Sequence, residues 1–379
     1  MKVLSLFDGM SCGQIALKQL GIRLETYYAS EIDQHAIRQT QLNFPETIQL
    51  GDVTQVDVRQ LEPIDLLIGG SPCQSFSFAG KRAGMSTTDK EEIHTLERYL
   101  ELKREGFRFE GESYLFWEYM RILTDIRKYN PDVLFLLENV EMGKKWERVL
   151  SEAIGIFGVH INSVLVSAQN RKRIYWTNIR TKKVGLFGEL HSDIPKPKDR
   201  HIQLTDILES HADSSYFLPN KALKKLLNNG HGIPDLSLLR GGSRIVCGAM
   251  RGRESVLSKN PSRTAQRLFV RNDGKTNCLT TVEKDNLVCE IQSPYERNSE
   301  PSLHALYGVD ARNNRFCLRV RRFTPIECAR LQTIPEWYQW KCSKMQQYRM
   351  LGNGWTVEVI VHIFSFLKDN IHINIQNIA

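Results

Sequence analysis

The stretch Gly69-Gly70-Ser71-Pro72-Cys73-Gln74-Ser75-Phe76-Ser77 decides the fold of this chain. It follows residues 64–68, a short apolar run typical of a buried parallel strand. Two glycines end the run, and Pro72 restricts the backbone directly before Cys73. Open α/β sheets bind their ligands at the carboxyl ends of parallel strands, where we expect this cysteine to lie. The competing interpretation, a buried cysteine beside an ordinary loop, is slightly favoured by the stretch taken alone.

Composition places the chain among ordinary globular proteins, because 41% of its 379 residues are hydrophobic and 25% are charged. No apolar run is long enough to cross a bilayer and no export signal opens the chain, so we expect a cytoplasmic protein. The eight cysteines include no C-x-x-C pair, which favours reduced thiols and argues against a bound metal. A net charge of +8 weakly favours a polyanionic partner.

The start of the chain has the pattern of a nucleotide site. Residues 3–7 are typical of a strand, the run Asp8-Gly9-Met10-Ser11-Cys12-Gly13 of a tight turn, and residues 14–20 of a helix. Glycines let a ligand approach the backbone, and the helix N-terminus offers free N–H groups. Neither G-x-G-x-x-G nor Gly-Lys-Ser/Thr is present, which disfavours a dinucleotide and a P-loop nucleotide.

Acidic residues follow the next two expected strands. Glu31 ends the strand at 26–30, where it can accept hydrogen bonds from ribose hydroxyls. Asp52 ends the strand at 48–50, where it can accept a hydrogen bond from an adenine amino group. Each acid alone is more often a solvated strand end. Together with the glycine turn, they predict an adenosine cofactor without pyrophosphate, namely S-adenosylmethionine.

The expected strand at 132–137 ends in Glu138 and Asn139, at the same sheet edge as Cys73. Arg171 and Arg173 precede a strand at 174–177 and point the same way if the backbone is extended. The run 161–166 lies between an expected helix at 145–157 and these arginines. The sequence predicts helices at 34–43, 96–107, 114–129 and 145–157, and another that runs through Leu367.

From about residue 181 the α/β alternation stops, and short strands and turn signals indicate a smaller, irregular, β-rich domain. We expect its arginines to contact phosphates and base edges, although a solvated basic surface is about as probable for any one of them. The arginines of this domain are Arg240, Arg244, Arg251, Arg253, Arg263, Arg267 and Arg271.

Regular structure returns near residue 316, where Thr324, Pro325 and Glu327 predict a capping box that starts a helix.

These motifs, in this order, resemble the DNA cytosine methyltransferases that act on carbon 5. The resemblance covers roughly residues 1–179 and 316–368, and the uncovered middle falls where that family carries its target recognition domain. It implies a Rossmann-like α/β sheet with helices on both faces, over a catalytic domain at 1–180, a target recognition domain at 181–315 and a returning segment at 316–379. The matching stretches are Phe7-Asp8-Gly9 with Gly13, Gly70-Ser71-Pro72-Cys73-Gln74, Glu138-Asn139-Val140, Gln169-Asn170-Arg171-Lys172-Arg173, Arg321 with Phe323-Thr324-Pro325, Ala329-Arg330-Leu331-Gln332, and Gly352-Asn353.

The resemblance also implies roles for individual residues. Cys73 would add to carbon 6 of cytosine, and Glu138 would bind N3 and the exocyclic amine. Arg173 would hold O2, Arg171 would support it or contact phosphate, and Asn139 would position the turn at Cys73. Residues 74–90 would close over a flipped base. The implied cofactor residues are Phe7, Asp8, Gly9, Gly13, Glu31, Ile32, Asp52, Val53, Gly70, Pro72 and Asn353.

The implied partner is double-stranded DNA, bound by a monomer, and whether a separately acting restriction endonuclease accompanies it stays open. The first motif, residues 7–13, departs from the family's commoner Phe-Ala-Gly-x-Gly-Gly and is closer to that of the eukaryotic de novo enzymes and some phage enzymes. A stand-alone bacterial or phage enzyme is favoured. A tRNA-methylating branch usually carries Cys-Phe-Thr, which Cys317-Leu318-Arg319 does not match. A catalytically silent DNA-binding protein would be favoured by loss of Cys73, Glu138 or Arg173, and all three are present. Enzymes that methylate exocyclic nitrogens would want Asp/Asn-Pro-Pro-Tyr/Phe instead.

Overall fold

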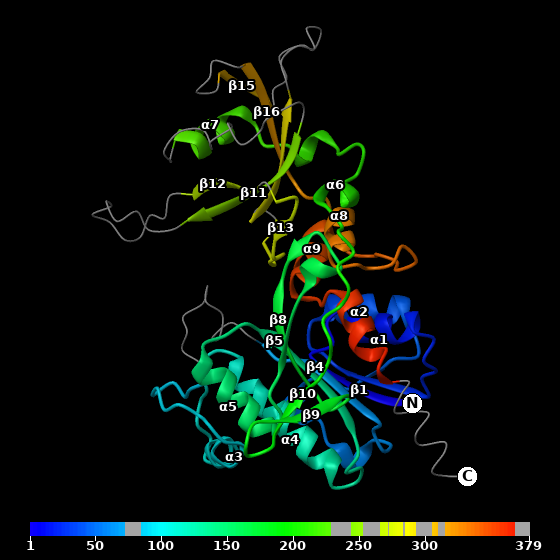
Figure 1. Cartoon of the computed structure of the whole chain (residues 1–379). Helices are drawn as coiled ribbons and strands as arrows, with labels where there is room; N and C mark the ends of the chain where they lie inside the picture. Colours follow the sequence, from blue (N-terminus) through cyan, green and yellow to red (C-terminus); the bar gives the residue numbers. More distant parts are fainter. Residues whose placement is uncertain are drawn as a thin grey trace.

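The chain folds into a large lobe and a small lobe, as a computed structural model shows (Figure 1). The structure describes residues 1–72, 85–228, 244–252, 266–271, 273–282, 285–292, 305–309 and 315–367. Cys73 and most of the loop predicted to close over the base therefore lie outside the described residues.

The large lobe is built on a seven-stranded sheet in the order β3-β2-β1-β4-β5-β8-β6. The five strands from β3 to β5 are parallel, whereas β8 runs antiparallel to β5 and β6 antiparallel to β8. The strand before Cys73, β4, lies in the middle, so its carboxyl end opens at the centre of the sheet edge. The strands are β1 (Lys2–Leu6), β2 (Thr26–Ser30), β3 (Ile48–Gln49), β4 (Leu66–Gly70), β5 (Leu134–Val140), β6 (Val159–Asn162) and β8 (Lys172–Thr177).

Helices cover both faces of this sheet because successive strand residues point to opposite sides. On β1, Val3 enters the core beneath α1 and α10, whereas Leu4 and Leu6 enter the core beneath α4 and α5. This confirms the predicted fold class. One face carries α1 (Cys12–Gln19), α2 (Gln34–Asn43) and α10 (Val357–Phe364), and the other carries α3 (Leu96–Arg104), α4 (Phe116–Arg127) and α5 (Lys144–Ile154) (Figure 1).

Short 3-10 turns follow two of the strands, and the second of them differs from the sequence prediction. β6 ends at Asn162, because the Asn162 side chain accepts a hydrogen bond from the Val164 N–H and starts η4 (Ser163–Leu165). Asp52 lies beyond the end of β3 and caps η1 (Val53–Gln55) in the same way. The other turns of this kind are η2 (Val58–Gln60), η3 (Ser113–Leu115) and η5 (Ser214–Tyr216).

The small lobe contains a five-stranded antiparallel sheet in the order β12-β11-β14-β16-β15, with its own apolar core. It is joined to the large lobe by β13 (Thr276–Asn277), which pairs with β7 (Gln169–Asn170) just before Arg171. Its strands are β11 (Arg244–Gly252), β12 (Gln266–Arg271), β14 (Asn286–Gln292), β15 (Ala305–Val309) and β16 (Arg315–Arg322). The hairpin of β9 (Thr181–Val184) and β10 (Glu189–Ser192) lies beside β8 in the large lobe, and α6 (Leu204–Ile207) and α7 (Asn220–Asn228) precede the small sheet.

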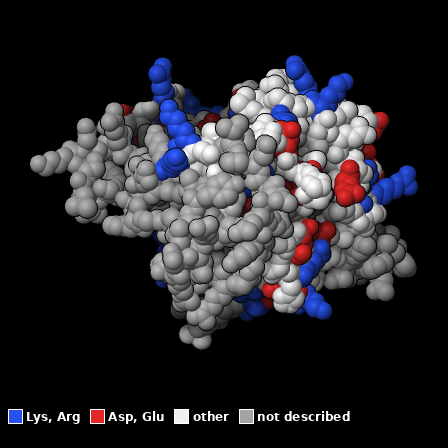
Figure 2. Space-filling view, turned by 90° about the horizontal axis from the view of Figure 1, so that it is seen from above, with Lys and Arg blue, Asp and Glu red and all other residues white. Residues whose placement is uncertain are grey.

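The basic stretch at 240–271 is described only in part. Arg240, Arg253 and Arg263 lie outside the described residues, and Arg271 pairs with Asp273. Seen from the small lobe, some of the described Lys and Arg side chains lie beside Asp and Glu side chains and others project away from them (Figure 2).

The chain returns to the large lobe through α8 (Pro325–Leu331) and α9 (Lys344–Asn353). The predicted capping box is confirmed: Thr324 accepts from the Glu327 N–H at 3.2 Å, and Glu327 accepts from the Thr324 N–H at 2.9 Å. This return places Asn353 against the sheet edge at which β4 ends.

Candidate active site

A cleft of about 370 Å³ opens at the carboxyl edge of the central sheet. All eleven residues that the sequence predicts for the cofactor line it, and so do Glu138, Arg171 and Arg173. Asn139 lies just outside the lining, and Cys73 directly follows the lining residue Pro72. The structure therefore brings the predicted cofactor and substrate residues to one cleft.

The glycine turn after β1 forms one wall of the cleft. Phe7 and Gly9 both have positive φ, at 57° and 58°. This turn directs the Gly9 N–H to Glu31 Oε2 at 2.8 Å, and Glu31 Oε1 accepts from the N–H groups of Ile32 and Asp33. The Ile32 side chain beside it is 71% exposed, which gives the cleft an uncovered apolar surface suited to a flat ring.

Asp8 lies in the same turn, and only one of its two carboxylate oxygens accepts a hydrogen bond from the described residues. Its Oδ1 accepts a hydrogen bond from the Tyr27 hydroxyl at 2.9 Å. Its Oδ2 is buried and has no hydrogen-bond partner in the described part of the chain. Burial raises the pKa of Asp8 to about 6, and the hydroxyls of Ser5, Tyr27 and Ser11 oppose this rise.

Asp52 and Val53 form the far end of the cleft. Asp52 Oδ1 accepts from the Thr54 N–H at 2.9 Å. The carbonyl of Val53 accepts from Arg121 of α4, whose guanidinium also meets the buried Glu118 at 2.7 Å. This end of the cleft is thus held by the helix layer behind the sheet.

Glu138 and Arg173 meet at the opposite end of the cleft. Arg173 Nε lies 2.8 Å from Glu138 Oε1, and the Trp355 indole N–H donates to Glu138 Oε2 at 3.1 Å. Gly70 leaves room for this arrangement, because a Cβ there would lie 2.9 Å from Trp355 Nε1 and 3.0 Å from Glu138 Oε2. The carboxylate is therefore fixed in direction, with a guanidinium beside it.

The Asn139 side chain lies on the segment that leads to Cys73. Its amide donates to the Ser71 hydroxyl at 3.0 Å and to the Ser71 carbonyl at 3.3 Å. Since Ser71 directly precedes Pro72, Asn139 acts on the chain that carries the cysteine.

Arg171 is buried, and its guanidinium is directed at backbone carbonyls. It donates to Gly354 at 2.8 Å and to Gly352 at 3.4 Å, both at the end of α9, and to Leu279 of the small lobe at 3.3 Å. The arginine therefore joins three segments that are far apart in the sequence.

Cys278, which the sequence analysis did not single out, lies against the same arginines. Its Sγ is 3.1 Å from Arg171 Nη1 and 3.7 Å from Arg173 Nη2. Burial alone would raise the pKa of the Cys278 thiol, but the charges of the two arginines lower it. The triplet Cys278-Leu279-Thr280 is also closer to Cys-Phe-Thr than Cys317-Leu318-Arg319 is, and this could have been noticed in the sequence.

Two further lining residues escaped the sequence analysis as functional candidates. Trp355 stands in the run Gly352-Asn353-Gly354-Trp355, which was the only signal for it. Arg349 of α9 lies 3.6 Å from Asp33 across the rim of the cleft and has no sequence signal.

The residues of the cleft fit S-adenosylmethionine. The volume lies within the range usual for small-molecule sites, and Ile32 offers an apolar face for an adenine ring. Glu31 and Asp52 carry carboxylates of the kind to which ribose hydroxyls and an adenine amine donate, and the Asp8 oxygen, which has no partner among the described residues, suits a cationic group. Among the described residues, no group of His, Cys, Asp and Glu side chains could hold a metal ion, and no helix is long and apolar enough to cross a membrane.

Comparison with known proteins identifies similar sequences and folds. The profile of the C-5 cytosine-specific DNA methylases matches residues 1–369. The orphan methyltransferase M.SPRI of Bacillus phage SPR is 27% identical over 98% of both chains. The type II methyltransferase M1.ScrFI of Lactococcus lactis subsp. cremoris is 26% identical over 95% of this chain and 76% of its own.

Solved structures share the fold. The S. pombe Dnmt2 methyltransferase superposes with a TM-score of 0.57 over 98% of this chain and 99% of its own, at 17% identity. The Entamoeba histolytica methyltransferase EhMeth does so with a TM-score of 0.59 over 98% of each chain, at 16% identity.

Proposed function

Since the chain belongs to the C-5 cytosine-specific DNA methylase family and is a DNA cytosine-5 methyltransferase, we propose that S-adenosylmethionine is its methyl donor and Cys73 its nucleophile. One observation carries the proposal. A single cleft has the predicted cofactor residues along its walls, the Glu138–Arg173 pair at one end, and Pro72, directly before Cys73, in its lining.

The nucleophile is needed because carbon 5 of cytosine is a weak nucleophile. The thiolate of Cys73 forms a bond to carbon 6, and the electron pair of the 5,6 double bond becomes available at carbon 5. The bound cofactor supplies the methyl group. Loss of the carbon 5 proton to a water then returns the electron pair and expels the thiolate, so the enzyme is regenerated.

Glu138 and Arg173 stabilise the negative charge that addition of the thiolate places on the cytosine ring. Glu138 accepts from the exocyclic amine and shares a proton with N3, and Arg173 donates to O2. Their 2.8 Å contact supports this assignment, because it holds an acceptor and a donor side by side, as the edge of a cytosine requires. Thymine lacks the amine and would leave Glu138 without its donor.

Arg171 and Asn139 are positioning residues in this proposal. Arg171 donates hydrogen bonds to the carbonyls of Gly352 and Gly354 and thereby fixes the cleft wall that carries Asn353 and Trp355. Asn139 fixes Ser71, and so the approach to Cys73. Neither is expected to touch the base.

The cytosine must leave the duplex, because a stacked base cannot present carbon 6 to a thiolate. We propose that residues 74–90 close on the flipped base and that the small lobe reads the DNA sequence. One chain then supplies both the chemistry and the recognition, so a monomer suffices.

The test is conversion-based cytosine sequencing of plasmid DNA treated with the protein and S-adenosylmethionine. We expect protected cytosines at one short recurring motif with wild type and none with Cys73→Ala, whereas Cys342→Ser, a cysteine away from the cleft, keeps the pattern. Binding of S-adenosylmethionine should survive in Cys73→Ala; loss of both binding and methylation would make Cys73 structural.

A tRNA substrate is the second candidate, favoured by the position of Cys278-Leu279-Thr280 beside Arg171. Unprotected plasmid together with methylated tRNA in the same assay would establish it. Protection of plasmid DNA alone would exclude it.

A further inference from the structure

Asp8, which lines the cleft, has a buried carboxylate oxygen, Oδ2, without a hydrogen-bond partner among the described residues. Of the other acids that line the cleft, Glu112 is exposed to solvent and Asp52 accepts from the Thr54 N–H. Glu138 meets Arg173, Asp33 meets Arg349, and Glu31 accepts from backbone N–H groups. A buried carboxylate without a cation is costly, and a cationic ligand placed beside it removes much of that cost.

Asp8 lies between the two ends of the cleft. On one side, the N–H of the next residue, Gly9, donates to Glu31 at the ribose end. On the other side, the Tyr27 hydroxyl that donates to Asp8 lies 3.5 Å from where a Cβ on Gly13 would stand, and the Trp355 ring lies equally close to that point. Trp355 in turn reaches Glu138 at the transfer end.

We propose that Asp8 makes the cleft select the cationic methyl donor over the product that remains after transfer. S-adenosylmethionine carries a positive sulfonium, and transfer of its methyl group leaves an uncharged thioether, S-adenosylhomocysteine. The carboxylate attracts the first and gains nothing from the second. The inference rests on the proposed cofactor, and it predicts that the product leaves readily.

The charge of Asp8 is sensitive to pH near 6, because burial raises its pKa to about that value. The groups that face it do not titrate there: burial raises the pKa of Tyr27 on β2 well above its usual range, that of Cys12 on α1 to about 12, and that of Tyr338 well above its usual range. The charge of Glu31 adds to the rise at Asp8. As pH falls through 6, Asp8 of the free enzyme gains a proton, so the preference for the cation should fall.

Equilibrium binding by titration calorimetry tests the proposal. The ligands are S-adenosylmethionine, S-adenosylhomocysteine and an analogue with a protonated amine in place of the sulfonium methyl. All three share the same amino acid end, so the ratio of affinities isolates the charge at the sulfur position. We expect Asp8→Asn to lower the preference for either cation over the thioether by about tenfold, the factor that one pKa unit represents.

Asp52→Asn is the matched control, because Asp52 also lines the cleft but lies at its far end. It should change the affinities of the three ligands by similar factors. In wild type, the ratio of the affinity for a cationic ligand to the affinity for S-adenosylhomocysteine should fall by about tenfold between pH 7.5 and pH 5. In Asp8→Asn this ratio should not change with pH.

Equal losses of affinity for cation and thioether in Asp8→Asn would overturn the proposal and leave Asp8 a structural residue. If that variant does not fold, the wild-type pH titration decides, and a constant ratio from pH 7.5 to 5 overturns it. Failure of wild type to bind any of the three ligands would instead contradict the proposed cofactor, so the two failures are distinguishable.

Discussion

At the scale of single residues, Glu138 depends on two donors from distant parts of the chain. Arg173 comes from β8, next to β5, whereas Trp355 comes from the C-terminal return, 217 residues away. A hydrogen bond to an ionised group contributes about 1.5–3 kcal/mol. The indole N–H should therefore hold Glu138 in the direction in which it meets the base.

Trp355→Phe keeps an aromatic ring but removes the N–H. We expect the rate of a single turnover to fall by about tenfold, since Glu138 loses one of its two donors. Trp337→Phe, at an exposed tryptophan that packs edge to face against Phe44 away from the cleft, serves as control and should leave the rate unchanged. An unchanged rate in Trp355→Phe would show that Arg173 alone positions the carboxylate.

The types of residue at the site were predictable from sequence, but their pairings were not. Glu138, Arg173 and the cofactor acids each follow or precede a strand, so the rule for the carboxyl edge of a sheet placed them together. Cys278 and Trp355 come from the small lobe and the C-terminal return, and only the packed structure shows that they reach Arg171 and Glu138.

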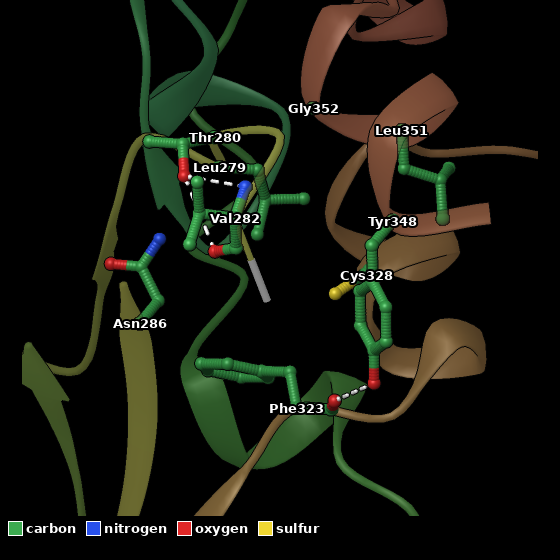
Figure 3. A pocket seen from close by; sticks show the side chains of 9 residues that line it. All are labelled: Leu279, Thr280, Val282, Asn286, Phe323, Cys328, Tyr348, Leu351 and Gly352. Atoms are coloured by element: carbon green, nitrogen blue, oxygen red, sulfur yellow. Dashed lines mark hydrogen bonds between the residues drawn. The ribbon is translucent and has the colours of Figure 1, made fainter. Parts of the chain in front are cut away.

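At the scale of elements, the end of α9 packs directly on the small-lobe loop that contains Leu279 and Thr280 (Figure 3). Gly352 permits this approach, since a Cβ there would overlap the backbone of Thr280. Leu351 and Tyr348 of the same helix face the loop, and the Tyr348 hydroxyl donates to the Phe323 carbonyl at 2.5 Å.

Gly352→Ala should force the loop and the helix apart. We expect the free energy of unfolding to fall by about 1–3 kcal/mol, because backbone atoms cannot yield as a flexible side chain does. Urea denaturation measures this, with Gly143→Ala as control, since nothing lies within 4 Å of a Cβ at that position. Equal effects of the two substitutions would mean that the contact contributes no stability.

Local rules account for the elements that were predicted and for those that were not. The helix at α2 (Gln34–Asn43) has the predicted bounds, and the Thr324–Glu327 capping box follows from residue types at fixed spacing. β6 ends at Asn162 because the Asn162 side chain competes with the sheet for the backbone, and the sequence analysis did not place this end. Such competition leaves no periodic signal in the sequence.

At the scale of the whole molecule, the two lobes are joined by buried polar groups. Arg171 ties the small-lobe loop to the end of α9, and Arg321 of β16 ties the small sheet to α8. The sequence predicted Arg321 as part of a motif, but not that it would meet the same Glu327 that caps α8. Buried contacts of this kind depend on how the two lobes pack together, and the pattern of residues along the sequence does not indicate that packing.

Arg321 is 2% exposed, and its guanidinium makes two hydrogen bonds of 2.8 Å to Glu327, which is fully buried. Arg321→Leu would leave Glu327 as a buried carboxylate without its cation. We expect the free energy of unfolding to fall by about 3–5 kcal/mol, because the desolvation cost of the remaining charge is no longer offset. Urea denaturation followed by circular dichroism measures the loss.

Two comparison variants show whether the loss of stability comes from the buried charge. Arg148→Leu breaks the exposed pair with Glu152 on α5 and should leave the free energy of unfolding nearly unchanged, since water screens that pair. Arg321→Leu combined with Glu327→Leu removes both buried charges and should recover part of the loss, although the helix cap goes with Glu327. A double variant no more stable than Arg321→Leu alone would show that the lobes are held by the cap and the packing around it, and not by the ion pair.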